Sequence, residues 1–182
     1  MGKTQRSFLI AHGDMDGFAC ALIASLAGVV RPEDVYFCGV KGLKRALKGV
    51  PDDVKRLYLC DLAPDRESAK VLNELASRGV EVTLIDHHTS PVYEELGGEN
   101  LRVVREEGVS AAEIAHKLFE HLIPEDRRRV ANFFLCMAAR VEGQVTEYVL
   151  RRLKGEDLTL LSDMAMLVHS LPYGRKRRLL RD

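Results

Sequence analysis

The side chains best suited to chemistry in this sequence are acidic residues and histidines that gather in three short stretches. In chain order they are His12, Asp14 and Asp16, then Asp61, then Asp86, His87 and His88. Carboxylates and imidazoles are ligands of divalent metal ions, and a buried charge is costly unless it is paired or coordinates a metal. The three stretches together predict a metal centre. On its own, the last triplet fits a surface loop with two incidental histidines equally well.

Each of these stretches directly follows an apolar run. The runs cover residues 7–11, 57–60 and 80–85, and the last is mostly β-branched, which is typical of a strand buried on both faces of a parallel sheet. Because the carboxyl ends of parallel strands lie at one edge of a sheet, where ligands bind, we expect the three stretches to meet there. Asp14 or Asp16 could instead cap the helix that starts near Gly17, and Asp61 could be a simple loop residue. Coincidence at three strand ends is the weaker explanation.

The order of the elements predicts an α/β fold. Strands are expected over residues 7–11, 35–38, 57–60, 80–85 and 101–104, and helices over residues 18–26, 64–78 and 110–122. Strands that alternate with helices at this spacing form right-handed βαβ units. We therefore expect a doubly wound, mainly parallel five-stranded sheet with helices on both faces, followed by a helical C-terminal segment.

The sequence pattern of the C-terminal third predicts helices throughout. Residues 126–140, 142–153 and 157–170 have helical periodicity, and residues 175–181 are mostly basic. We expect residues 1–123 to form an α/β metal-binding domain and residues 124–182 a helical extension packed on it. The basic tail could be a solvated helix end or a contact for nucleic acid.

Composition limits the classes of function. The 182 residues carry 27 basic and 27 acidic side chains, so the net charge of zero argues against nucleic-acid binding by bulk electrostatics and leaves only local patches. Four cysteines without C-x-x-C spacing, most of them in apolar patterns, indicate a reducing compartment. The sequence shows no signal peptide, and its longest apolar stretch, residues 19–30, is too short to span a membrane. A cytoplasmic protein without membrane attachment is expected.

The order of the motifs resembles the DHH phosphoesterase superfamily. The pattern consists of His12-x-Asp14-x-Asp16-Gly17, then Asp61 alone after a strand, then the triplet 86–88 after the next strand. The superfamily includes RecJ-type exonucleases, nanoRNases that degrade short oligonucleotides, cyclic-dinucleotide phosphodiesterases and family II pyrophosphatases. The resemblance covers residues 6 to about 122 well and the remainder loosely.

This resemblance implies one or two Mn²⁺ or Mg²⁺ ions and the residues that hold them. Asp61 would bridge both ions. Asp14, with His12 as a further candidate, would hold the first ion, and Asp16 with His87 would hold the second. The implied chemistry is hydrolysis of a phosphoester by metal-activated water, with two ions stabilising the attacking and leaving oxygens.

Further residues are implied to act on the phosphate. His88 would face the scissile phosphate, and Asp86 would orient the histidines. The basic residues Lys41, Lys44 and Arg45 follow the second strand and could neutralise substrate phosphates, although a solvated helix face explains them equally well.

Two departures from the superfamily qualify the expected activity. Members have another aspartate after the triplet, in a stretch that corresponds to residues 135–143, where this sequence has none. Glu142 is the nearest carboxylate and a candidate replacement, and Arg140 or Gly143 could occupy the position instead. Many members also carry a C-terminal substrate-binding domain, which we do not expect within this chain.

Two classes of function stay open at this point. The first is a Mn-dependent phosphoesterase acting on phosphodiester or phosphomonoester bonds of short single-stranded oligonucleotides or small nucleotides. The second is a catalytically degenerate member that serves as a protein- or nucleic-acid-binding subunit, alone or in a homo-oligomer. A pyrophosphatase is disfavoured because those members have a histidine where this chain has Ile10. The retained set of metal-binding residues favours the enzyme.

Overall fold

The computed structural model describes residues 5–153 and 158–181 and contains a five-stranded, wholly parallel sheet. Its strands are β1 (Arg6–His12), β2 (Val35–Cys38), β3 (Val54–Cys60), β4 (Glu81–Asp86) and β5 (Leu101–Arg105). Their order across the sheet is β2-β1-β3-β4-β5. Since β1 lies inside the sheet with later strands on both sides, the chain winds outward in both directions from it.

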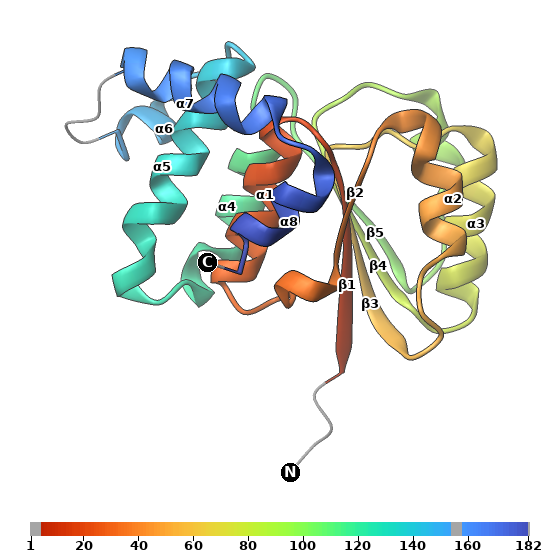
Figure 1. Cartoon of the computed structure of the whole chain (residues 1–182). Helices are drawn as coiled ribbons and strands as arrows, with labels where there is room; N and C mark the ends of the chain where they lie inside the picture. The colour runs from red at the N-terminus through yellow and green to blue at the C-terminus, as the bar shows by residue number, and fades with distance from the viewer. Residues whose placement is uncertain (1–4, 154–157, 182) are drawn as a thin grey trace.

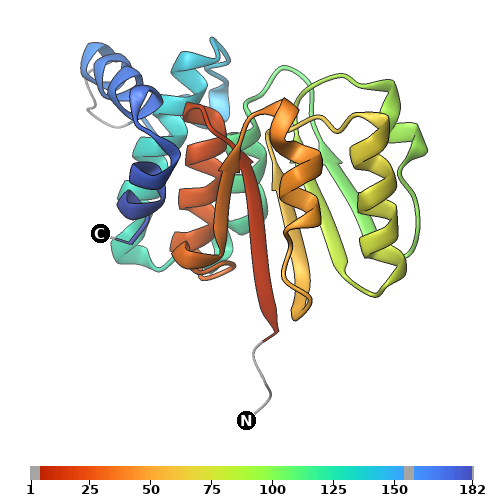
Figure 2. The same cartoon turned by 45° about the vertical axis from the view of Figure 1, so that its right-hand side comes forward.

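Helices cover both faces of the sheet, as predicted (Figures 1 and 2). One face carries α2 (Leu43–Lys48) and α3 (Arg66–Ser77), and the other carries α1 (Met15–Leu26) and α4 (Ala111–Phe119). The next helix, α5 (Glu125–Val141), packs on the outside of α1 and α4. The chain continues through α6 (Glu147–Leu150), α7 (Leu158–Ser170) and α8 (Tyr173–Leu179). The expected doubly wound α/β fold is therefore confirmed.

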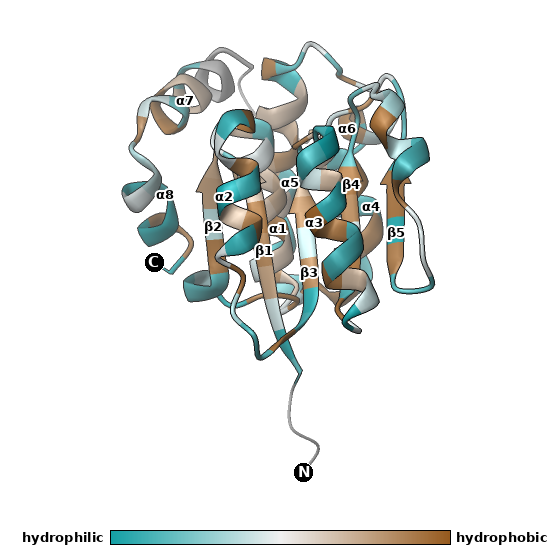
Figure 3. Ribbon diagram, turned by 90° about the vertical axis from the view of Figure 1, so that its right-hand side faces the viewer, coloured by the Kyte–Doolittle hydropathy of each residue, from teal (hydrophilic) through white to brown (hydrophobic). Residues whose placement is uncertain are grey.

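Burial on both faces explains why the strands are apolar without strict alternation. Leu9 and Ala11 pack into the core beneath α1 and α4, whereas Ile10, between them, packs into a second core beneath α2 and α3. All three side chains are fully buried. Figure 3 shows the resulting apolar strands behind helices that present hydrophilic residues to solvent.

Side-chain caps fix where the helices begin. Asp14 accepts a hydrogen bond from the Gly17 N–H at 3.0 Å and caps α1, so this helix starts three residues before the apolar pattern predicts. Ser110 accepts one from the Glu113 N–H at 3.2 Å and caps α4. The cap on α1 also sets the direction of the loop that carries the first acidic stretch.

The C-terminal helices differ from the predicted ones. The expected helix over residues 142–153 is wrong in extent, because α5 ends at Val141, Gly143 takes a left-handed conformation (φ 68°) and only Glu147–Leu150 is helical. Of the segment 157–170, residue 157 lies outside the described residues and the rest forms α7. The basic tail forms α8, which packs beside β2. The division at residue 123 stays a prediction.

Two predictions about the environment can be compared with the structure. All four cysteines are buried free thiols. Within residues 5–153 and 158–181, every helix is too short or too polar to cross a membrane.

Candidate metal centre

The acidic and histidine stretches lie together at the carboxyl edge of the sheet. Asp14 follows β1, Asp61 follows β3, and the triplet beginning at Asp86 ends β4. Asp61 takes a left-handed backbone conformation (φ 58°), the only non-glycine residue to do so in the described part of the chain. Such a conformation costs of order 1 kcal/mol in a non-glycine residue and often marks a functional site. It turns the buried Asp61 carboxylate toward the histidines of both neighbouring loops.

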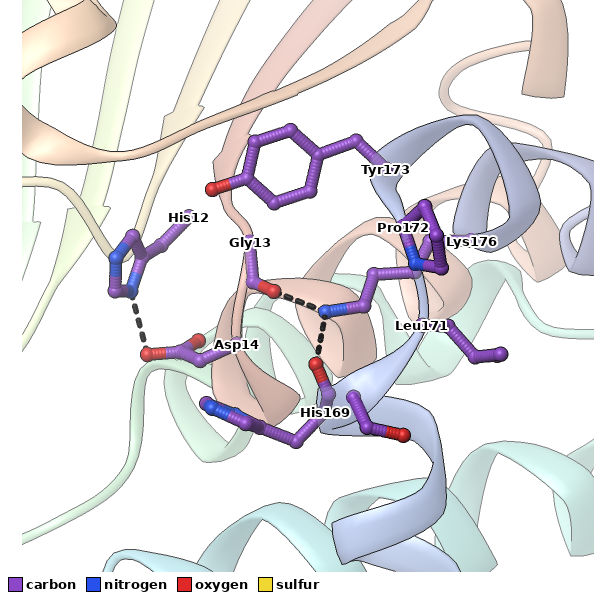
Figure 4. Close-up of a pocket in the computed structure, with 9 residues that line it drawn as sticks. His12, Gly13, Asp14, His169, Leu171, Pro172, Tyr173 and Lys176 are labelled. Carbon is purple, nitrogen blue, oxygen red and sulfur yellow. Dashed lines mark hydrogen bonds and ion pairs between the residues drawn. The ribbon is translucent and has the colours of Figure 1, made fainter.

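One group of potential ligands lies on the β1 side of Asp61. His12 Nδ1 is 2.5 Å from Asp14 Oδ2, a hydrogen bond drawn in Figure 4, and 3.6 Å from Asp61 Oδ2. The ligand atoms of these three residues all lie within 4.8 Å of one another. This spacing is compact enough for a single cation to contact all three.

A second group lies on the β4 side and shares Asp61. His87 Nε2 is 3.4 Å from Asp61 Oδ1, and His88 Nδ1 is 3.9 Å from the same oxygen. With Asp86, these residues again offer ligand atoms within 4.8 Å of one another. The two carboxylate oxygens of Asp61 thus face different groups, Oδ2 toward His12 and Oδ1 toward His87.

Asp86 supports the second group of potential ligands through hydrogen bonds. Its Oδ1 accepts hydrogen bonds from the His87 N–H at 2.8 Å and from the His88 ring at 2.7 Å, and its Oδ2 accepts one from the Tyr93 hydroxyl. Burial opposes ionisation, but the hydrogen bonds from His88 and Tyr93 lower the pKa of Asp86. Asp86 therefore stays ionised, holds the His88 imidazole and accepts from the backbone at His87. Tyr93 has no distinguishing pattern in the sequence.

Asp16 lies behind the cluster and is completely buried. Its two oxygens accept hydrogen bonds from the N–H groups of Ala111 and Ala112, each at 2.8 Å, so Asp16 ties the start of α1 to the start of α4. Oδ2 still lies 3.7 Å from His87 Nε2. Burial, and then the charge of Asp61, raise the pKa of Asp16 well above its usual range. Asp16 therefore combines a structural role with a place next to His87.

Electrostatics favour a cation between these side chains. The hydrogen bonds to Asp14 and Asp61 raise the pKa of His12 to about 10, and the hydrogen bond to Asp61 raises the pKa of His87 to about 9. Burial acts in the opposite direction on Asp14, but the hydrogen bond from His12 lowers the pKa of Asp14 to about 2. The carboxylates thus attract positive charge strongly enough to hold protons on both imidazoles.

The segment after α5 supplies two more side chains. Glu142 is half-buried, and its burial, followed by the charges of Asp61 and Asp14, raises its pKa. Gln144 Nε2 lies 3.5 Å from His87 Nδ1, whereas Gln144 Oε1 is buried without a hydrogen-bond partner among the described residues. The charges of the cluster thus influence Glu142, but the side chain that contacts His87 is Gln144, which the sequence did not single out. Arg140 is exposed.

The basic residues expected to bind phosphate remain outside the cluster. Lys41 lies in the short turn before α2, and Lys44 and Arg45 lie on the exposed side of α2. Lys44 Nζ is 3.2 Å from Glu67 on α3. Among the residues that the structure describes, these three bases contact none of the acidic and histidine residues above, so the solvated-helix interpretation describes their positions better.

A hollow of about 430 Å³ opens beside His12 and Asp14. Its other wall comes from the end of α7 and the start of α8, far away in sequence (Figure 4). Lys176 on α8 is buried, and its ammonium donates hydrogen bonds to the carbonyl oxygens of Gly13 and His169. One lysine therefore fixes α8 against the loop that carries the first group of ligands. A lysine within a basic run gives no sequence signal for this role.

Comparison with known proteins supports the fold and finds one partial sequence similarity. No family model matches the chain. Over 91 residues it is 31% identical to the oligoribonuclease NrnB of Bacillus subtilis, a match that covers 47% of this chain and 23% of that protein. Among solved structures, a DHH domain from a member of the s1p family of ribosomal proteins has a TM-score of 0.65 at 14% identity, covering 97% of this chain and 54% of that one.

Manganese-bound exonuclease RecJ has a TM-score of 0.52 at 17% identity, covering 81% of this chain and 42% of that one. CDC45 of Entamoeba histolytica has a TM-score of 0.54 at 16% identity, covering 89% of this chain and 34% of that one. The chain therefore spans about half or less of the length of the proteins that it matches.

Proposed function

We propose that the chain is a member of the DHH phosphoesterase superfamily and a divalent-metal-dependent phosphoesterase acting on short oligonucleotides or small nucleotides. Its fold and its partial sequence similarity to NrnB support this proposal. The observation that carries this proposal is the position of Asp61, whose two oxygens face two separate groups of ligands. A carboxylate shared in this way is suited to bridging two cations. The similarity to NrnB and to RecJ supports a nucleotide or nucleic-acid substrate.

The donor set fits Mn²⁺ or Mg²⁺. The ligand atoms are carboxylate oxygens and imidazole nitrogens without a thiolate, which suits Mn²⁺ in particular. The buried Gln144 Oε1 provides a further test of this fit. An imidazole that binds a metal through Nε2 carries its proton on Nδ1 and needs an acceptor there. Gln144, already 3.5 Å from His87 Nδ1, can turn its amide and present Oε1 as that acceptor.

Roles follow for the residues of the chain. His12, Asp14 and Asp61 would hold one ion, and Asp61 with His87 would hold the other. Asp16 lies next to His87 and would complete the second position. Bound ions supply Lewis-acid polarisation of the phosphate and activation of water.

His88 has the exposure that a substrate-contacting residue needs. Its side chain is 48% exposed, in contrast to that of His87 at 10%, and Asp86 fixes its Nδ1. With Nδ1 held, the other ring nitrogen is directed away from Asp86 and can donate a hydrogen bond to a phosphate oxygen. His88 would therefore orient the phosphate and stabilise the negative charge that develops on it.

The test is hydrolysis of a short RNA by the purified chain with Mn²⁺. Asp61→Asn should abolish both metal binding and turnover, because one residue serves both ion positions. His88→Ala should lower turnover about tenfold or more while it retains the metal. The matched control is Asp52→Asn, whose carboxylate is exposed at the opposite end of β3. Turnover that survives Asp61→Asn would contradict the proposal.

A binding subunit remains the second candidate, favoured by the neutral Gln144 next to His87, directly after the stretch in which the superfamily has an aspartate. Wild-type protein that binds metal and RNA but hydrolyses no substrate would support this candidate. The cytoplasmic location, which agrees with four buried free thiols, and an association with itself or another protein are further proposals.

A further inference from the structure

The hollow beside His12 and Asp14 is lined in part by the aromatic ring of Tyr173. It is lined on one side by the loop after β1 and on the other by His169, Pro172 and Tyr173 (Figure 4). Its volume of about 430 Å³ lies within the range of about 300–1,000 Å³ that is typical of small-ligand sites. The hollow thus adjoins the proposed centre and has room for part of a substrate.

Packing on one side fixes the ring of Tyr173. A Cβ atom on Gly13 would lie 2.0 Å from Tyr173 Cε1, so only glycine allows the ring to approach the loop this closely. The centroid of the Phe37 ring lies 6.5 Å away at an interplanar angle of 39°. Lys176, one turn further along α8, anchors the helix to the Gly13 carbonyl. Despite these contacts Tyr173 as a residue is 45% exposed, so part of it remains available for contact.

The charges around the hollow are already paired. The Asp14 carboxylate in its wall is hydrogen-bonded to His12, and the ammonium of Lys176 donates to two backbone carbonyl oxygens instead of the open space. The hollow therefore offers little attraction to an anionic phosphate group. A flat, neutral, aromatic group would instead gain contact with the exposed part of Tyr173.

The next residues along α8 are basic. A second concave surface is lined by Gly174, Arg177, Arg178 and Arg181, which follow Tyr173 along the chain. Phosphates that flank a base on Tyr173 would find positive charge here, as the backbone of a single strand requires. This arrangement fits an oligonucleotide better than a free nucleotide or an inorganic phosphate.

We propose that Tyr173 is a stacking platform for the nucleobase next to the scissile phosphate, and that the substrate is therefore a short single-stranded oligonucleotide. This inference rests on the proposed phosphoesterase function, because the base is positioned relative to that centre. Base stacking on aromatic side chains tolerates every base, so Tyr173 would contribute affinity for nucleic acid with little preference for sequence.

The experiment measures binding separately from turnover. A dinucleotide that carries 2-aminopurine, whose fluorescence falls on stacking, is titrated into the full chain without added Mn²⁺ or Mg²⁺, so that it is not hydrolysed during the measurement. We expect quenching with wild-type protein and a dissociation constant about fivefold to a hundredfold higher for Tyr173→Ala. Tyr173→Phe should keep the wild-type affinity, because it retains the ring. The matched control is Tyr36→Ala on β2, where the tyrosine is similarly exposed at 43%.

Three results would overturn the inference: no binding of the dinucleotide by wild-type protein, equal affinity for Tyr173→Ala, or equal affinity for a dinucleotide without the base. Failure of the proposed function looks different. Binding that depends on Tyr173 without any hydrolysis refutes the phosphoesterase and supports the platform. Hydrolysis with unchanged affinity and KM for Tyr173→Ala supports the phosphoesterase and refutes the platform.

Discussion

Replacing Lys176 by methionine tests whether α8 is held against the metal centre by a single buried ammonium. Lys176 is 1% exposed, and its Nζ donates to the carbonyl oxygens of Gly13 and His169, the second at 3.0 Å. Burial lowers the pKa of Lys176, whereas the nearby Asp14 raises it. Methionine keeps most of the apolar stem and removes the donor. The substitution therefore isolates the two hydrogen bonds from the packing of the side chain.

The expected loss follows from these two bonds. Each hydrogen bond to a charged group contributes about 1.5–3 kcal/mol, so the pair contributes about 3–6 kcal/mol. Removing a buried ammonium also removes its desolvation penalty, which offsets part of this loss. We expect a net decrease of about 2–4 kcal/mol in the free energy of unfolding. For a chain of this length, that decrease corresponds to a fall in Tm of about 4–16 °C.

Thermal unfolding followed by circular dichroism measures the effect. The matched control is Lys48→Met at the exposed end of α2, which should change the free energy of unfolding by less than about 0.5 kcal/mol. We also expect Lys176→Met to weaken binding of the 2-aminopurine dinucleotide, because Tyr173 would lose its fixed position. A Tm for Lys176→Met equal to that of the Lys48→Met control would refute the tethering role.

Three further outcomes are expected. Near pH 7, Mn²⁺ should displace up to one proton each from His12 and His87, because the pKa values of these imidazoles are about 10 and about 9 without metal, and a metal binds neutral imidazole. The affinity for Mn²⁺ should therefore rise with pH up to about 10, the higher of the two pKa values. Calorimetry in buffers of different ionisation enthalpy counts the protons, and their absence would exclude both histidines as ligands. Glu142→Gln should weaken Mn²⁺ binding, measured by calorimetry, if its half-buried carboxylate replaces the missing aspartate, and normal binding would show that it does not. The double substitution of Arg177 and Arg181 by alanine should reduce the slope of log affinity against log salt by about 1.4 for single-stranded RNA, and an unchanged slope would exclude both as phosphate contacts.

The sheet and the gathering of the acidic residues could be predicted because both depend on local patterns. Apolar runs identify the strands, and the first polar residue after a run marks its carboxyl end. Parallel order then brings Asp14, Asp61 and His87 to one edge without any knowledge of the loops. The short distances from Asp61 to both histidines agree with that expectation.

The supporting residues could not be predicted because their partners are distant in sequence and their types are ordinary. Tyr93 donates to Asp86 from a short helical turn, and Lys176 reaches Gly13 across 163 positions of sequence. The helix expected over residues 142–153 failed for another reason. Its apolar periodicity is real, but the left-handed Gly143 ends the preceding helix and Thr146 caps a new, short one.

That break in the helix determines what stands in place of the missing aspartate. With α5 ended at Val141, the chain turns at Gly143 and brings Gln144 to the outer ring nitrogen of His87. The Nδ1–H of His87 is present both in the protonated ring and in a ring that binds a metal through Nε2, so the amide oxygen of Gln144 can accept from it in both states. Gln144 adds no negative charge, however, and both oxygens of Asp16, the other carboxylate beside His87, already accept hydrogen bonds from backbone N–H groups. The ion beside His87 is therefore held less strongly than the ion beside His12. We therefore expect the two ions to bind with unequal affinity, and the weaker one, at His87, to limit turnover at low Mn²⁺ concentration.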